Sequence, residues 1–131
     1  MLKIVCSAAV LLGTAIVAGC GPSGPIMVPV SGTVTLDGKP LDDGTIYFKT
    51  IMEGSIDRMD VKEGKFAGQV EIGDRRVEVC RFRSSKPTKV GNDVFPNTVN
   101  TIPARYNAKS ELTAKVSESG PNEFTFDVKS K

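Results

Sequence analysis

The sequence contains no histidine and no tryptophan, and tyrosine occurs only twice among its 131 residues. Without histidine, a serine or cysteine nucleophile lacks the imidazole that usually activates it, and zinc lacks its usual His and Cys cluster. Without tryptophan, a glycan-binding groove has few aromatic platforms on which a sugar ring can stack. We therefore expect no catalytic residue, no metal site and no cofactor, and the chain is predicted not to be an enzyme.

The charge is nearly balanced, with 17 Lys and Arg residues against 15 Asp and Glu residues. A dedicated nucleic-acid surface would show a strong basic excess, so we expect no nucleic-acid partner. Calcium takes several oxygen ligands, but the aspartates do not follow the Asp-x-Asp-x-Asp-Gly spacing of a calcium loop. The simpler interpretation is that these aspartates form turns and lie on solvated strand faces.

Cysteine is also scarce. Cys6 and Cys20 belong to the N-terminal segment, so Cys80 has no partner in the rest of the chain and no disulfide framework is expected. A single cysteine inside a strand-like run such as residues 77–82 is most often a small buried hydrophobe.

The N-terminal segment is the most informative part of the sequence. An apolar run, residues 4–17, follows Lys3 and is shorter than the roughly 20 residues of a membrane span. A basic start, a short apolar run and small residues before a cleavage point describe a secretory signal peptide. The ending Val17-Ala18-Gly19-Cys20 resembles the bacterial lipobox. That resemblance implies a signal peptide over residues 1–19 and acylation, palmitate included, of Cys20. The alternatives are an ordinary signal peptide with an incidental cysteine, or a short membrane span.

A tether is expected next, over residues 20–26, because its glycines and prolines have no pattern that could bury anything. Two or three acyl chains on Cys20 would hold the chain at a membrane almost irreversibly. This predicts an extracytoplasmic, lipid-anchored protein. Residue 21 is Gly rather than Asp, which by resemblance to the sorting rule of enteric bacteria favours the outer membrane.

From residue 27 onward, apolar residues recur with period two between turn residues, which indicates strands. Asp37-Gly38 and Glu63-Gly64 are turn signals. No helical period of useful length occurs after Cys20. We predict an all-β domain over residues 27–131, a single antiparallel β-sandwich of about seven strands. The expected strands cover residues 28–36, 45–49, 55–61, 65–72, 75–83, 111–116 and 123–129.

Between residues 84 and 101 the period-two pattern of apolar residues is lost, and we predict a long polar loop containing Pro87, Gly91 and Pro96. Long loops in compact domains are usually functional, partner-covered or mobile. Arg105, Tyr106 and Asn107 follow this loop, and Tyr and Arg are favoured at binding surfaces. They are the candidate binding residues. The alternative is that Tyr106 plugs the sandwich edge and Asn107 caps a turn.

Several segments resemble a known family. Residues 30–41 (VSGTVTLDGKPL) and 44–48 (GTIYF) resemble the first hairpin of carboxypeptidase-regulatory-like domains, which have a transthyretin-like (prealbumin-like) fold. Gly64-Lys65-Phe66 is similar to the family's Gly-x-Phe turn, and 102–107 (IPARYN) and 122–128 (NEFTFDV) are similar to the C-terminal half of small lipoproteins built on this domain. The resemblance implies the sandwich and the lipoprotein class, and it carries over no catalytic residue.

Two departures from this family matter. The family often has an Asp-x-x-Gly turn before the Gly-x-Phe strand, where this chain has residues 60–64 (DVKEG). Its central strand usually reads Gly-x-Tyr-x-Val, where this chain has residues 74–79 (DRRVEV). The same fold can host hydroxyisourate hydrolase, whose active site is lined by His and Arg residues. This chain has no histidine and does not resemble that site. We therefore expect a non-catalytic binding or structural module of the bacterial cell envelope, anchored to the membrane through Cys20, with an envelope protein or a glycan as partner. The alternative is a carbohydrate or small-ligand module using the 84–107 loop.

Overall fold

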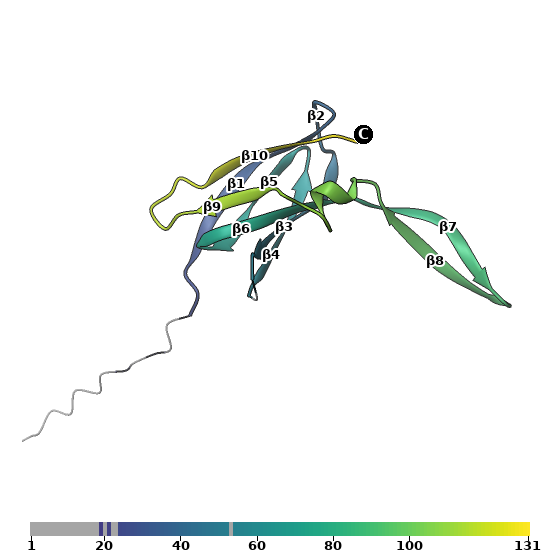
Figure 1. The fold of residues 1–131 in the computed structure, drawn as a ribbon, viewed down its shortest axis with the longest axis horizontal. Helices are drawn as coiled ribbons and strands as arrows, with labels where there is room; N and C mark the ends of the chain where they lie inside the picture. The colour runs from purple at the N-terminus through teal and green to yellow at the C-terminus, as the bar shows by residue number, and fades with distance from the viewer. Residues whose placement is uncertain (1–18, 20, 22–23, 53) are drawn as a thin grey trace, which may run out of the picture.

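The computed structural model describes residues 19, 21, 24–52 and 54–131. The proposed signal peptide and its lipidated cysteine therefore lie outside the described residues, apart from Gly19. In the described part, the chain forms strands and one short 3-10 helix (Figure 1). These elements are β1 (Met27–Leu36), β2 (Lys39–Pro40), β3 (Asp43–Thr50), β4 (Ile56–Lys62), β5 (Lys65–Glu71), β6 (Gly73–Cys80), β7 (Phe82–Val90), β8 (Asp93–Asn100), η1 (Ala104–Tyr106), β9 (Thr113–Val116) and β10 (Glu123–Val128).

The two turns expected from the sequence are present. Asp37 and Gly38 both have positive φ, at 51° and 81°, and connect β1 to β2. Glu63 and Gly64 do the same between β4 and β5, at 52° and 77°. Two consecutive positive φ values define the type I′ turn, whose twist matches that of the flanking strands.

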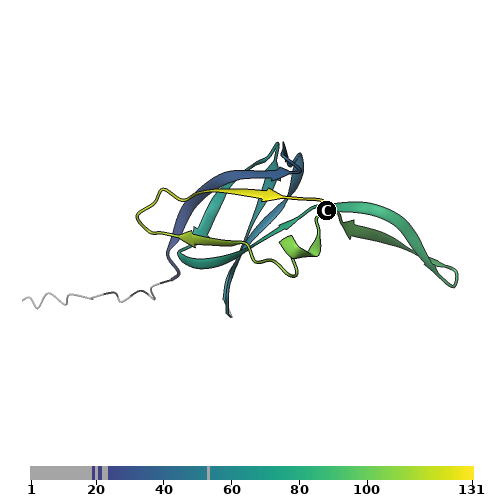
Figure 2. The same cartoon turned by 45° about the horizontal axis from the view of Figure 1, so that its top comes forward.

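The strands form two leaves of one strongly folded sheet. The order is β10-β1-β5-β4-β3-β6-β9, with β2 beside β1. At the β4–β5 turn the pairing is confined to Lys62 and Lys65, so the two strands diverge at once. One leaf is β10-β1-β5 and the other is β4-β3-β6-β9, and they lie over each other in Figure 2. The fold is an all-β sandwich, as predicted, with neighbours antiparallel except the parallel pair β1–β10.

The core fills the space between the leaves. Phe48 of β3 lies with its ring centroid 6.0 Å from those of Phe66 and Phe124 and 6.4 Å from that of Phe126, all three on the opposite leaf. The remaining core side chains are mainly valines in alternate strand positions, which is the period-two pattern seen in the sequence. The seven expected strands correspond to β1, β3, β4, β5, β6, β9 and β10.

Strand β6 is buried on both faces at its C-terminal end, where Val77 and Val79 alternate with Glu78 and Cys80. The sequence indicated this end as covered on both sides or bulged, because Val77 and Val79 alternate with Cys80 and Phe82. The strand ends at Cys80, however, rather than at Arg83.

The predicted long loop over residues 84–101 is wrong. The segment forms a β-hairpin, β7–β8, that extends away from the sandwich as a separate two-stranded sheet, called the arm below (residues 82–100; Figure 1). Its side chains are exposed along nearly the whole length. With neither face buried, nothing imposes the apolar alternation from which strands are recognised.

Within the described residues, no helix is both long enough and apolar enough to cross a membrane.

Candidate binding surface: the arm and its base

The arm leaves the sandwich directly after β6 and returns just before η1. At this junction Arg81 and Thr101 join the outgoing and the returning segments through hydrogen bonds. The N–H of Thr101 donates to the carbonyl of Arg81 at 2.8 Å, and Arg81 Nε donates to Thr101 Oγ1 at 2.7 Å. Asn100 Oδ1 accepts the N–H groups of Arg81 and Ile102 at 3.0 and 3.1 Å. The base of the arm is therefore fixed by a dense set of hydrogen bonds.

An ion pair braces the arm against β3. The guanidinium of Arg83 donates to both carboxylate oxygens of Asp43, with a distance of 2.8 Å from Nη1 to Oδ2. This hydrogen bond is the main cause of a lowered pKa for the Asp43 carboxyl and a raised pKa for Arg83. Beside it, Phe82 borders a shallow hollow of about 290 Å³ over β3 and β4.

The turn of the arm has the chemistry of a tight hairpin. Val90 pairs with Asp93, so Gly91 and Asn92 form a two-residue loop. Gly91 has a φ of +64°, as the first position of a type II′ turn requires. Gly-Asn between two strand-like runs was thus the sequence signal that could have identified the hairpin.

One face of the arm carries three exposed large apolar side chains. Directly paired residues of an antiparallel ladder share a face, and alternate residues along a strand return to it. The pairs Arg83–Val99, Thr88–Phe95 and Val90–Asp93 therefore place Val90, Phe95 and Val99 on one face. These three side chains are 61%, 53% and 45% exposed. Large side chains at this exposure are contacted by little else in the described part of the chain.

The arm has more basic than acidic residues, and a proline interrupts each of its strands. Its charged residues are Arg83, Lys86 and Lys89 against Asp93. Pro87 and Pro96 occupy the middle of the two strands, where the register shifts between Ser85 and Thr88. Proline has no N–H to donate, so neither outer edge of the arm offers a full-length ladder to another strand. This favours binding through side chains on a face over open-ended pairing of edges.

The three residues expected from the sequence to bind lie beside the arm, in and just after η1. Arg105 is exposed, and its guanidinium carbon lies 4.9 Å from the ring centroid of Tyr106. Arg105 Nη2 donates to the carbonyls of Lys129 and Lys131 at 3.2 and 2.6 Å. Tyr106 is half-buried and packs against the core. These two side chains border a shallow hollow of about 380 Å³.

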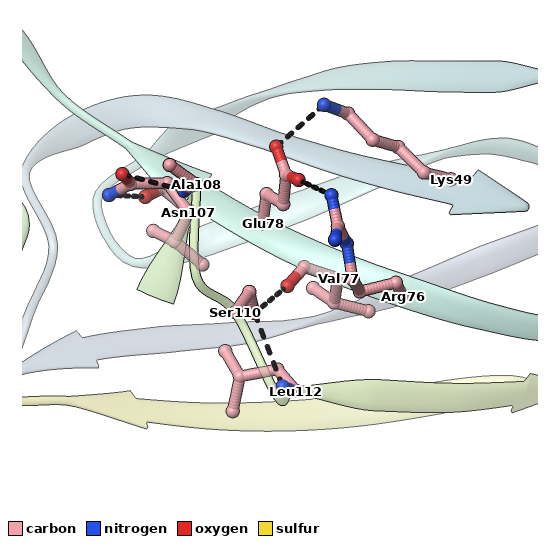
Figure 3. A network of polar contacts seen from close by, with 9 residues as sticks. Lys49, Arg76, Val77, Glu78, Asn107, Ala108, Ser110 and Leu112 are labelled. Atoms are coloured by element: carbon pink, nitrogen blue, oxygen red, sulfur yellow. Dashed lines mark hydrogen bonds and ion pairs between the residues drawn. The ribbon is translucent and has the colours of Figure 1, made fainter. Parts of the chain in front are cut away.

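Asn107 is placed differently from its two neighbours. It is buried, and its Nδ2 donates to the carbonyls of Val79, Ile102 and Pro103 at 3.3, 3.0 and 2.9 Å. Figure 3 shows it in the same region as Ser110, whose hydroxyl donates to the carbonyl of Val77 and accepts the N–H of Leu112. Asn107 thus joins the post-arm segment to β6, and its side chain has no free surface to offer.

The described residues hold no cluster of three or more His, Cys, Asp or Glu that could bind a metal ion. Burial raises the pKa of the Cys80 thiol, which suits a thiol that packs rather than one that reacts.

Comparison of this chain with family models, with curated proteins and with solved structures finds no match.

Proposed function

We propose that the chain is a lipid-anchored docking module of the bacterial cell envelope, which binds a protein partner through the apolar face of its arm. The observation that carries the binding role is the arm itself. A two-stranded hairpin is marginally stable alone. Here it extends from the sandwich with Val90, Phe95 and Val99 exposed on one face. The anchoring role rests on the sequence that ends in Cys20.

The position of the arm relative to the tether supports this role. Ile26 enters the sandwich beside Ile72, whose N–H donates to the Ile26 carbonyl at 3.0 Å. Gly73 follows at once and begins β6, and the arm starts just after the other end of that strand, at Cys80. Eight strand residues separate these two ends by about 25 Å. The tether and the arm therefore leave the sandwich at opposite ends (Figure 1), and the arm extends the reach by about 30 Å more.

The chemistry of the arm favours a protein over a glycan. Its exposed large side chains are valines and phenylalanines, and it has no tyrosine or tryptophan. Aliphatic and aromatic anchors suit a protein partner with an apolar patch.

The test has two parts. Intact-mass measurement of the mature chain checks the anchor, which requires loss of residues 1–19 and an acyl increment. Photocrosslinking in cell envelopes checks the arm, with the crosslinker at Thr88, on the apolar face. The same experiment is repeated with Phe95→Ser and Val99→Ser together. The matched control is Val94→Ser, which removes an exposed valine from the other face.

Phe95 and Val99 contact solvent, so their replacement should leave folding unchanged and abolish a specific protein adduct that the Val94→Ser chain still forms. An adduct that survives the double replacement refutes the docking role of this face. Captured glycan in place of protein supports the small-ligand alternative instead.

A further inference from the structure

The exposed large apolar side chains of the described residues fall into two groups. One group lies on the arm. The other comprises Ile26, Met27, Ile51, Met52 and Ile56, which are 47%, 42%, 64%, 87% and 61% exposed. Nothing in the proposed docking role uses this second group.

The second group lies at the end of the sandwich where the tether enters. Met27 pairs with Glu71, and the hydroxyl of Ser55 donates to the Glu71 carboxylate. Ser55 is held in turn by Thr50, whose N–H and hydroxyl both donate to the Ser55 carbonyl, at 3.2 and 3.1 Å. The start of β1 and the β3–β4 connection are thus joined through one short chain of contacts, and we call this end of the sandwich the tether pole.

Three carboxylates near the tether pole are engaged with neighbouring groups. Glu71 lies 3.2 Å from the guanidinium of Arg75, and Asp57 accepts the N–H of Glu71 at 3.1 Å. Glu78 lies between Lys49, at 2.7 Å, and Arg76. Pairing lowers the desolvation cost of bringing such groups close to an apolar medium.

We infer that the tether pole is a membrane-contacting surface, with Ile51, Met52 and Ile56 entering the interface of the bilayer to which Cys20 is anchored. This inference rests on the proposed lipid anchor. Five residues separate Cys20 from Ile26, so the six steps of chain between them place the pole at most about 20 Å from the acylated residue. A short tether gives the bilayer a high effective concentration at this surface, above that of any free partner.

Side chains of this kind bind interfaces by burying apolar area at the headgroup boundary. Such contact would orient the sandwich, because the pole would face the lipid while the arm points away from it. The tether alone would leave the orientation free.

The chain has no tryptophan, so a single introduced tryptophan reports its own surroundings. The acylated full chain carrying Met52→Trp is reconstituted in vesicles of phosphatidylethanolamine and phosphatidylglycerol, with or without bromine on the lipid acyl chains. The matched control carries Val90→Trp at the turn of the arm, where the native side chain is also largely exposed. Brominated lipid should quench the M52W chain and shift its emission to the blue, and should leave the V90W chain unchanged. Adding Ile51→Asp and Ile56→Asp to M52W should reduce its quenching to the V90W level.

Equal quenching of M52W and V90W on chains with confirmed acyl mass overturns the inference and leaves the anchor standing. If the emission of the M52W tryptophan shifts to the blue without bromine quenching, and light scattering shows a dimer, the pole contacts a second copy of the chain. That result also overturns the inference of membrane contact. A mature chain without any acyl increment refutes the anchor and the inference together, and intact mass distinguishes that outcome from the others.

Discussion

Replacing Asn107 by alanine removes the side-chain amide that joins the post-arm segment to β6. The amide has two hydrogens, and the carbonyls of Pro103 and Ile102, at 2.9 and 3.0 Å, are its closest acceptors. The third carbonyl, that of Val79, is at 3.3 Å and shares a hydrogen. The Asn107 side-chain oxygen accepts the N–H of Ala108 at 2.9 Å. Three well-formed bonds at about 1 kcal/mol each predict a loss of about 2–3 kcal/mol in the free energy of unfolding.

Urea unfolding measures this loss. With an m-value of about 1–2 kcal/mol per molar urea, the midpoint should fall by about 1–2 M. The matched control is Asn97→Ala on the exposed arm, where the same truncation should change the free energy of unfolding by less than about 0.5 kcal/mol.

Asn107→Asp sharpens the test, because it places carboxylate oxygens against carbonyl oxygens. Repulsion raises the pKa of this carboxyl in the folded state, so its protonated form is the one that folding favours. Stability of the variant should therefore be higher below about pH 4 and be lost as the pH rises through the raised pKa. Near neutral pH the Asp variant should be at least as unstable as the Ala variant. Wild-type stability of N107D at neutral pH would refute the reasoning, since it would mean that the three carbonyls do not depend on a donor from this side chain.

Three further results are expected. Gly32→Ala should destabilise the sandwich by about 1–3 kcal/mol in urea unfolding, because a Cβ there would lie 1.9 Å from the carbonyl oxygen of Phe124; an unchanged midpoint would contradict the close approach of β1 and β10. Cys80 is 7% exposed, so a thiol reagent should label its thiol slowly in the folded chain and rapidly in the denatured chain. Rapid labelling of the folded state contradicts this. The hydrogen bond from Arg83 lowers the pKa of Asp43 from 3.8, so its contribution to stability is present above pH 3.8 and is lost as the pH falls through the lowered value. The urea midpoint of the wild type should then fall more steeply below pH 3.8 than that of Asp43→Asn, and parallel curves would show that the ion pair contributes nothing.

Most of the sandwich could be predicted because most of its strands have one buried face. Val28, Val30 and Val34 in β1, and Phe66 and Val70 in β5, alternate with polar residues as that geometry requires. The turns could be predicted because positive φ selects glycine, and Gly38 and Gly64 occupy such positions.

The arm could not be predicted in this way. Burial of one face creates the period-two alternation of apolar residues, and the arm is exposed along nearly its whole length. Asn107 shows a different limit. Its residue type suits a turn, a cap or a binding surface equally well, and only its position against the Val79 and Ile102 carbonyls distinguishes them. Arg75 shows the same limit. Its buried guanidinium donates to the carbonyls of Glu71 and Ile72, which the β5–β6 turn places beside it. Acylation of Cys20 and the transthyretin-like resemblance stay predictions.

The parallel pairing of β1 with β10 has a mechanical consequence. Strand β1 continues the tether, and it is bonded to β10 on one side and to antiparallel β5 on the other. A pull on the tether, resisted by a partner holding the far end, acts along these strands and stretches all their backbone hydrogen bonds at the same time. Bonds loaded together in shear resist far more force than bonds opened one after another. The sandwich is therefore built to stay folded while under tension.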